Sequence, residues 1–128
     1  MLFDQSQESL ESLIAKSADL TNKPYLHSVV KVSGGYNLES EEVDLTVHIL
    51  CRDIKGIRLE KYDIELEIFK SNNEFVIVLA KLNFPNEPIL WSGSKTLWMH
   101  STTGKKTNPP SYSFNLENLA NRIRVFVN

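Results

Sequence analysis

The stretch from residue 42 to residue 82 predicts three consecutive β-strands, and the first two alternate hydrophobic and polar positions. Successive residues of a strand point to opposite faces of a sheet, so the first two strands each have one apolar face. The first apolar face comprises Val43, Leu45, Val47, Ile49 and Cys51. The second comprises Tyr62, Ile64, Leu66 and Ile68, with Asp63, Glu65 and Glu67 on the polar side.

The third strand, residues 75–80, is hydrophobic at every position, so both of its faces need a cover. The two asparagines before it tolerate the positive φ values of a tight hairpin turn, which fixes the register with the preceding strand. The expected pairs are Leu66 with Leu79, Glu67 with Val78, Ile68 with Ile77, and Phe69 with Val76. The second face of this hairpin is then acidic toward one edge and hydrophobic toward the other.

Helical patterns flank the strands. Residues 4–20 carry a narrow apolar stripe, with Asp4 as the expected N-cap and Pro24 beyond the expected end. Apolar residues recur at helical spacing after Asn115, the expected N-cap of a second helix. The β-branched residues near the C-terminus leave a strand as the alternative there.

Three shorter stretches, residues 26–32, 89–91 and 96–99, predict further strands, and residues 101–113 an irregular loop. The chain of 128 residues fits a single domain. We therefore predict an α+β fold: an N-terminal helix, an antiparallel sheet of about six strands and a C-terminal helix, with both helices packed on one sheet face. A small closed β-barrel with flanking helices is the alternative.

Composition narrows the function classes. The chain is 41% hydrophobic and 23% charged, with a net charge of −2, so no overall positive field attracts nucleic acid. The N-terminal residues lack the pattern of a secretory signal, and no apolar run has the ~18 residues of a membrane span. With a single cysteine, the chain predicts a cytoplasmic protein that is not bound to a membrane.

Candidate catalytic groups are sparse. Two stretches resemble a phosphate loop, Gly93-Ser94-Lys95-Thr96 and Gly104-Lys105-Lys106-Thr107. Both lack its glycine spacing and its strand-to-helix setting. His48 and Cys51 fall on opposite faces of one predicted strand, which excludes a shared metal ion. Cys51 lies in phase with core residues, so a nucleophilic pair with His27 or His100 is disfavoured. We expect no cofactor and no metal, and the chain is more typical of a non-enzymatic protein.

Two polar alternatives stay open. A pairing of His48 with Asp63 on the neighbouring strand would bring a base and a carboxylate together. The acidic row of Asp63, Glu65 and Glu67 could attract a cation or a basic partner, although such rows commonly serve solubility. Mutation of His48 tests the first alternative.

Hydrophobic residues give the best functional lead, because tryptophan is enriched at protein interfaces. We predict a protein-binding or assembly module that uses the mixed sheet face or the region around the tryptophans. The candidate binding residues are Phe69, Val76, Val78, Trp91, Trp98 and Met99. A partner protein or a second copy in a homodimer would cover them. The alternative function is a carrier of a small apolar ligand, in a cavity lined by Tyr62, Phe75, Trp91 and Trp98.

Overall fold

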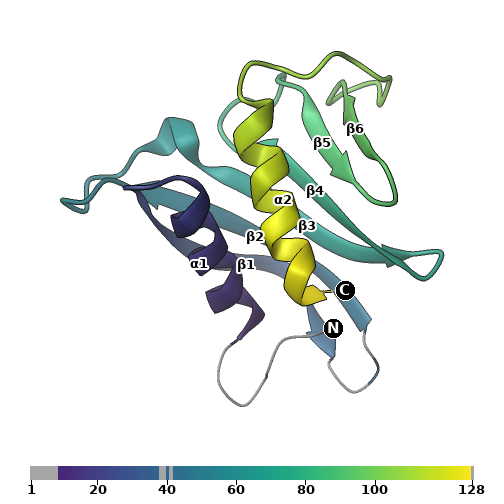
Figure 1. Ribbon diagram of the computed structural model, residues 1–128, viewed down its shortest axis with the longest axis horizontal. Coiled ribbons are helices and arrows are strands. Elements are labelled where there is room, and N and C mark those ends of the chain that lie inside the picture. The colour runs from purple at the N-terminus through teal and green to yellow at the C-terminus, as the bar shows by residue number, and fades with distance from the viewer. Residues whose placement is uncertain (1–8, 38–39, 41, 128) are drawn as a thin grey trace.

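The computed structural model describes residues 9–37, 40 and 42–127. Its strands form one open antiparallel sheet in the order β1-β2-β3-β4-β5-β6 (Figure 1). The α+β prediction is confirmed, and the closed barrel is wrong. In chain order, the elements are α1 (Leu10–Thr21), β1 (Leu26–Asn37), β2 (Glu42–Arg52), the short 3₁₀-helix η1 (Glu60–Tyr62), β3 (Ile64–Ser71), β4 (Glu74–Lys81), β5 (Ile89–Ser92), β6 (Thr96–Met99) and α2 (Ser113–Val127).

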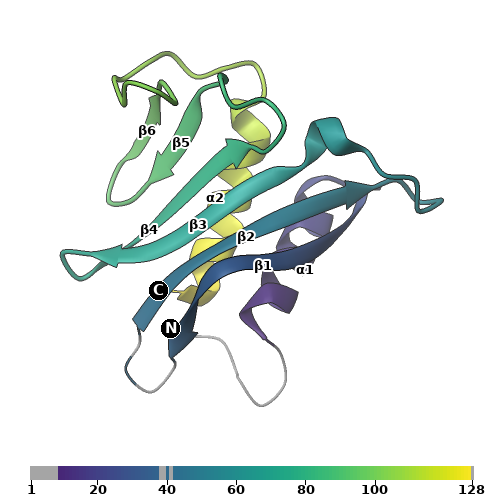
Figure 2. The same ribbon diagram turned by 180° about the vertical axis from the view of Figure 1, so that it is seen from behind.

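Both helices cover the same face of the sheet, which we call the inner face (Figure 1). The view from behind shows that neither helix covers the opposite face, which we call the outer face (Figure 2). Because strand residues alternate between the two faces, this arrangement buries every second residue of β2 and β3. The fold therefore leaves one sheet face without a helical layer.

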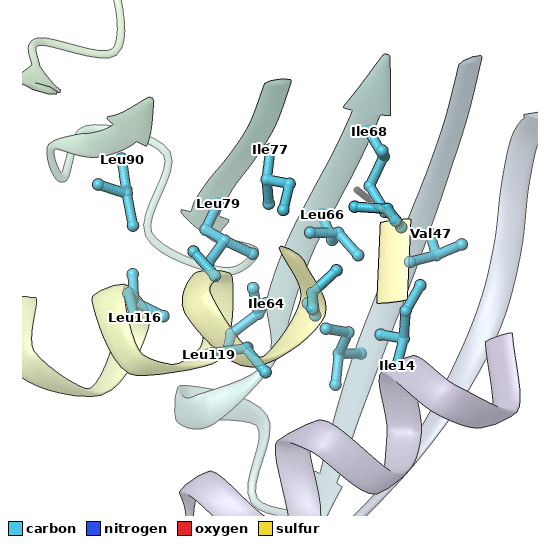
Figure 3. Close-up of a cluster of buried hydrophobic side chains, with 14 of the residues drawn as sticks. Ile14, Val47, Ile64, Leu66, Ile68, Ile77, Leu79, Leu90, Leu116 and Leu119 are labelled. Carbon is cyan, nitrogen blue, oxygen red and sulfur yellow. The ribbon is translucent and has the colours of Figure 1, made fainter. Parts of the chain in front are cut away.

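The core fills the space between the inner face and the helices (Figure 3). Strand residues that point inward meet the apolar stripes of α1 and α2, and their side chains are almost fully buried. Burial of such side chains contributes roughly 1.5–3 kcal/mol each before entropy is counted. Members that Figure 3 labels are Ile14, Val47, Ile64, Leu66, Ile68, Ile77, Leu79, Leu90, Leu116 and Leu119.

The β3–β4 hairpin has the predicted register. All four expected pairs are present, including Ile68 with Ile77 and Phe69 with Val76. Asn72 and Asn73 have positive φ angles of 52° and 64°, as a two-residue hairpin turn requires. The turn residues and the hydrophobic alternation therefore specify the same pairing.

Helix α1 begins at Leu10, later than the start of the predicted range, residues 4–20. Ser9 is its N-cap, and the Ser9 hydroxyl accepts a hydrogen bond of 3.1 Å from the backbone N–H of Ser12. The predicted cap, Asp4, lies outside the described residues. At the other end Asn22 is the C-cap, just ahead of Pro24, so the predicted end is confirmed.

Three other element boundaries differ from prediction. Strand β1 continues past residue 32 to Asn37, because a bulge after Lys31 and the positive φ of Gly34 let it keep pairing with β2. Helix α2 begins at Ser113, ahead of the expected cap Asn115. Tyr62 belongs to η1 rather than to the core face of β3, and it is 40% exposed. The helical interpretation of the C-terminal segment is confirmed.

Candidate functional site

The outer face carries a connected group of hydrophobic side chains over β3 to β6. In the ladder, Trp91 of β5 lies opposite both Val78 of β4 and Leu97 of β6. The Trp91 ring meets Phe69 of β3 edge to face, with 5.6 Å between the ring centroids and an interplanar angle of 71°. We call this group the outer patch, and it consists of Phe69, Val78, Ile89, Trp91, Leu97 and Met99.

Most of the predicted binding residues belong to this face, but two have no open surface. Val76 points outward opposite Phe69, yet it is only 3% exposed. The side chains of Val76 and Trp91 both lie next to Gly93. Trp98 points inward and is 4% exposed, with its ring edge-on to Tyr112 at 6.0 Å. The two tryptophans thus lie on opposite faces of the sheet.

Sequence reasoning missed two members of the outer patch. Ile89 pairs with Met99, and Leu97 pairs with Trp91, so both point outward with their partners. The signal was present in the alternation of residues 89–91 and 97–99, where the middle residue of each triplet, Leu90 or Trp98, is buried. Alternation within these two short strands assigns their outer residues to the outer face and their middle residues to the core.

An acidic row borders the outer patch on β2 and β3. Glu67 lies between Thr46 and Val78 in the ladder, with Glu65 on the same strand. Burial raises the pKa of the Glu67 carboxyl above its ordinary value, and the charges of Asp44 and Glu65 raise it further. A basic group brought to this row would therefore relieve repulsion among like charges.

The acidic row is shorter than the sequence suggested, because Asp63 is not part of it. Asp63 is 2% exposed, and its carboxylate accepts hydrogen bonds from Arg58 Nη1 at 3.0 Å and Nη2 at 2.6 Å. It also accepts a bond of 2.8 Å from the backbone N–H of Cys51. Burial disfavours the carboxylate, but these hydrogen bonds outweigh it and lower the pKa of Asp63.

The proposed pairing of His48 with Asp63 is wrong. The ladder places His48 opposite Glu65, and His48 Nε2 lies 3.1 Å from Glu65 Oε2. Both side chains are partly exposed on the outer face, so the pair is a surface contact of small energy. The His48 base and the Glu65 carboxylate lie on the outer face, beside the outer patch.

Cys51 lies on the inner face, directly opposite His27 of β1. The His27 ring is turned to Asp19 of α1, with 2.9 Å between Nδ1 and the carboxylate oxygen. Burial raises the pKa of the Cys51 thiol to about 11, with a further increase from the charge of Asp63. The Cys51 thiol is therefore protonated at neutral pH, whereas a nucleophilic cysteine reacts as the thiolate. Among the described residues, no three His, Cys, Asp or Glu side chains are grouped as metal ligands would be.

Both edges of the sheet are shielded against a further strand. Along β1, the side chain of Lys31 shares the inner face with Val47, and the bulge that follows breaks the regular edge. Along β6, the loop after the strand returns to cover it. There the backbone N–H of Thr107 donates to the Trp98 carbonyl at 2.8 Å, and Met99 forms an isolated bridge with Lys106. Neither edge therefore offers a regular backbone ladder for pairing with a further strand.

A cavity of about 330 Å³ opens where the end of α1, the start of α2 and η1 meet at one end of the molecule. Of the four side chains expected to line a carrier cavity, only Tyr62 lines this one. Phe75 and Trp98 belong to the core, and Trp91 belongs to the outer patch. The cavity depends on where three chain segments end, so the strand pattern alone did not reveal it.

These features define a small α+β protein with a six-stranded open sheet, helices on one face and an apolar patch on the other. The chain belongs to the family described as domain of unknown function (DUF8659), which matches residues 11–126. Comparison with curated proteins and with solved structures found no match. No helix in the described part of the chain is long and apolar enough to cross a membrane.

Proposed function

We propose that this protein is a non-enzymatic binding module that docks a partner protein on the outer face of its sheet. The observation that carries the proposal is the outer patch, a group of hydrophobic residues on the face that neither helix covers (Figure 2). Aromatic and branched side chains grouped beside an acidic row resemble an interface centre with a charged rim.

The chemistry of the surface indicates what the partner should offer. An apolar centre would pack on Trp91 and Val78, and basic side chains would meet Glu67 and its acidic neighbours. The shielded edges of β1 and β6 favour face-on docking over addition of a strand. A second copy of the chain could also cover the outer patch, and the protein would then be a homodimer.

We further propose a cytoplasmic location, which the single cysteine supports. Cys51 is a free, buried thiol, and unpaired cysteines are typical of proteins in reducing compartments. The net charge of −2 supports a protein partner rather than nucleic acid. The protonated thiol of Cys51 and the arrangement of the histidines support a role without catalysis.

The test compares two variants of the outer face. Val78→Lys places a charge in the centre of the outer patch, whereas Val30→Lys places the same charge on β1, where Val30 is 50% exposed. The proteins are immobilised and exposed to an extract of the source cells, and native mass spectrometry reports the subunit count. We expect wild type and Val30→Lys to retain the same partner and Val78→Lys to lose it. Retention by all three would contradict the proposal.

A carrier role is the second candidate, and the cavity at the helix ends is the observation that favours it. The cavity lies on the inner side of the sheet, so it is separate from the outer patch. Bound small molecule in the native mass spectrum, unaffected by Val78→Lys, would support the carrier role. Both roles can therefore be tested in the same spectra.

A further inference from the structure

We propose that the cavity at the helix ends binds a small aromatic anion, a planar ring that carries one carboxylate or a similar acidic group. The inference gives the carrier role a ligand class, and it does not depend on docking at the outer patch. The cavity volume of about 330 Å³ lies at the lower end of the range typical of small-molecule sites.

The walls of the cavity are aromatic. Tyr25 and Tyr62 both line it, and their rings are stacked with 5.5 Å between centroids and an interplanar angle of 23°. Tyr112 lines it from the segment that enters α2. Burial and the nearby Glu87 carboxylate raise the pKa of Tyr112 to about 12, so its hydroxyl stays neutral at physiological pH. A lining with three aromatic rings favours a flat ring over a branched aliphatic chain.

The charge of the cavity is positive. Lys23 and Lys81 line it, and none of the described residues that line it is acidic. Lys81 Nζ lies 4.4 Å from the centroid of the Tyr112 ring, so the cation is held at the aromatic wall. A ligand that presents an aromatic ring and an anion together therefore matches the lining better than a neutral apolar ligand.

Two further features suit an anion and a ring. The first turn of α2 contributes Asn115 and Leu116 to the lining, and the N-terminal end of a helix carries partial positive charge. The floor is apolar, because Ile64, Leu116 and the protonated thiol of Cys51 reach it. The C-terminal end of α1 carries the opposite partial charge, but Lys23, the residue after the C-cap Asn22, offsets it.

The experiment is a calorimetric titration with naphthoate, with naphthamide as the neutral ligand of the same shape. We expect naphthoate to bind at least about tenfold more tightly, as one charge-assisted contact allows. Lys81→Met should remove most of that preference, because methionine keeps the packing on Tyr112 without the charge. Lys70→Met is the matched control, since Lys70 Nζ also lies over a ring, 5.5 Å from the Phe75 centroid, but outside this cavity.

Equal affinity for naphthoate and naphthamide, or no binding of either, would overturn the proposal. So would a Lys81→Met protein that keeps the full preference for the anion. If Lys81→Met does not fold, as judged by circular dichroism, Lys23→Met carries the same test. Trp91→Ala should bind naphthoate as the wild type does, so failure of this proposal is distinguishable from failure of docking at the outer patch.

Discussion

Replacement of Asp63 should weaken the fold most at the end of the sheet that borders the cavity. Asp63→Ala removes an almost fully buried carboxylate that joins the Cys51 backbone to the Arg58 guanidinium. The change leaves the Cys51 N–H without its acceptor. The Arg58 guanidinium loses its carboxylate partner and keeps its 2.8 Å hydrogen bond to the Cys51 carbonyl oxygen. Loss of one member of a buried ion pair costs about 3–5 kcal/mol. Because the Arg58 side chain is about one third exposed and can turn to water, we expect a loss of about 3 kcal/mol.

The pH dependence of this effect has a defined sign. The folded-state pKa of Asp63 lies below its ordinary value, so the stabilisation is present above the unfolded pKa of ~3.9. It is lost as the pH falls through the folded-state pKa. The stability difference between wild type and Asp63→Ala should therefore be largest near neutral pH and shrink in strong acid.

Urea unfolding followed by tryptophan fluorescence, to which the buried Trp98 contributes, measures the difference at each pH. Asp63→Asn is the matched control, because the amide oxygen can still accept from the Cys51 N–H while the charge is gone. It should lose less stability than Asp63→Ala at neutral pH. A loss below about 1 kcal/mol for Asp63→Ala, or a difference that does not change with pH, would refute the reasoning.

Three further changes, the last with a matched control, test other parts of the structure by the same unfolding assay. Arg124→Leu should lower the free energy of unfolding by about 2 kcal/mol, because the Arg124 guanidinium on α2 donates to both the carbonyl and the hydroxyl oxygen of Ser92. An unchanged urea midpoint would contradict this role. Glu67→Gln should stabilise the protein at neutral pH by up to about 1 kcal/mol and have no effect in acid. The reason is that the folded-state pKa of Glu67 is raised, so its ionisation removes stability as the pH rises. A loss of stability at neutral pH would contradict this prediction. Gly34→Ala should destabilise by more than about 1 kcal/mol, since φ is +78° and the new Cβ would lie 1.8 Å from a β2 carbonyl oxygen. Gly35→Ala, which meets nothing within 4 Å, should be nearly neutral, and equal effects of the two glycine changes would refute the steric argument.

The strand pattern predicted the sheet well because two independent signals agreed. The asparagine pair set the turn, the alternation set the faces, and the register of Ile68 with Ile77 followed from both. The same alternation failed at Asp63, where the chain is not yet in β3. A carboxylate beside Arg58 can be buried when the pair forms, and hydrophobic periodicity does not detect such a pair.

The two proposed binding surfaces were predictable to different extents. The outer patch follows from strand parity, which separates Trp91 from Trp98 once the short strands are aligned. The cavity depends on how the ends of α1, α2 and η1 meet, and its residues are far apart in the sequence. Packing against the sheet sets where the helix ends lie. No local sequence pattern therefore predicts that Tyr25, Tyr62 and Lys81 come together.

We propose above all that the outer patch contacts another protein chain in the cell. The most direct measurement places a photoreactive amino acid at Val78 in one protein and at Val30 in another, followed by irradiation of the source cells and mass spectrometry of the adducts. We expect a specific adduct from position 78, to a partner or to a second copy, and none at the exposed position 30. Equal adducts from both positions, or none from position 78, would contradict it.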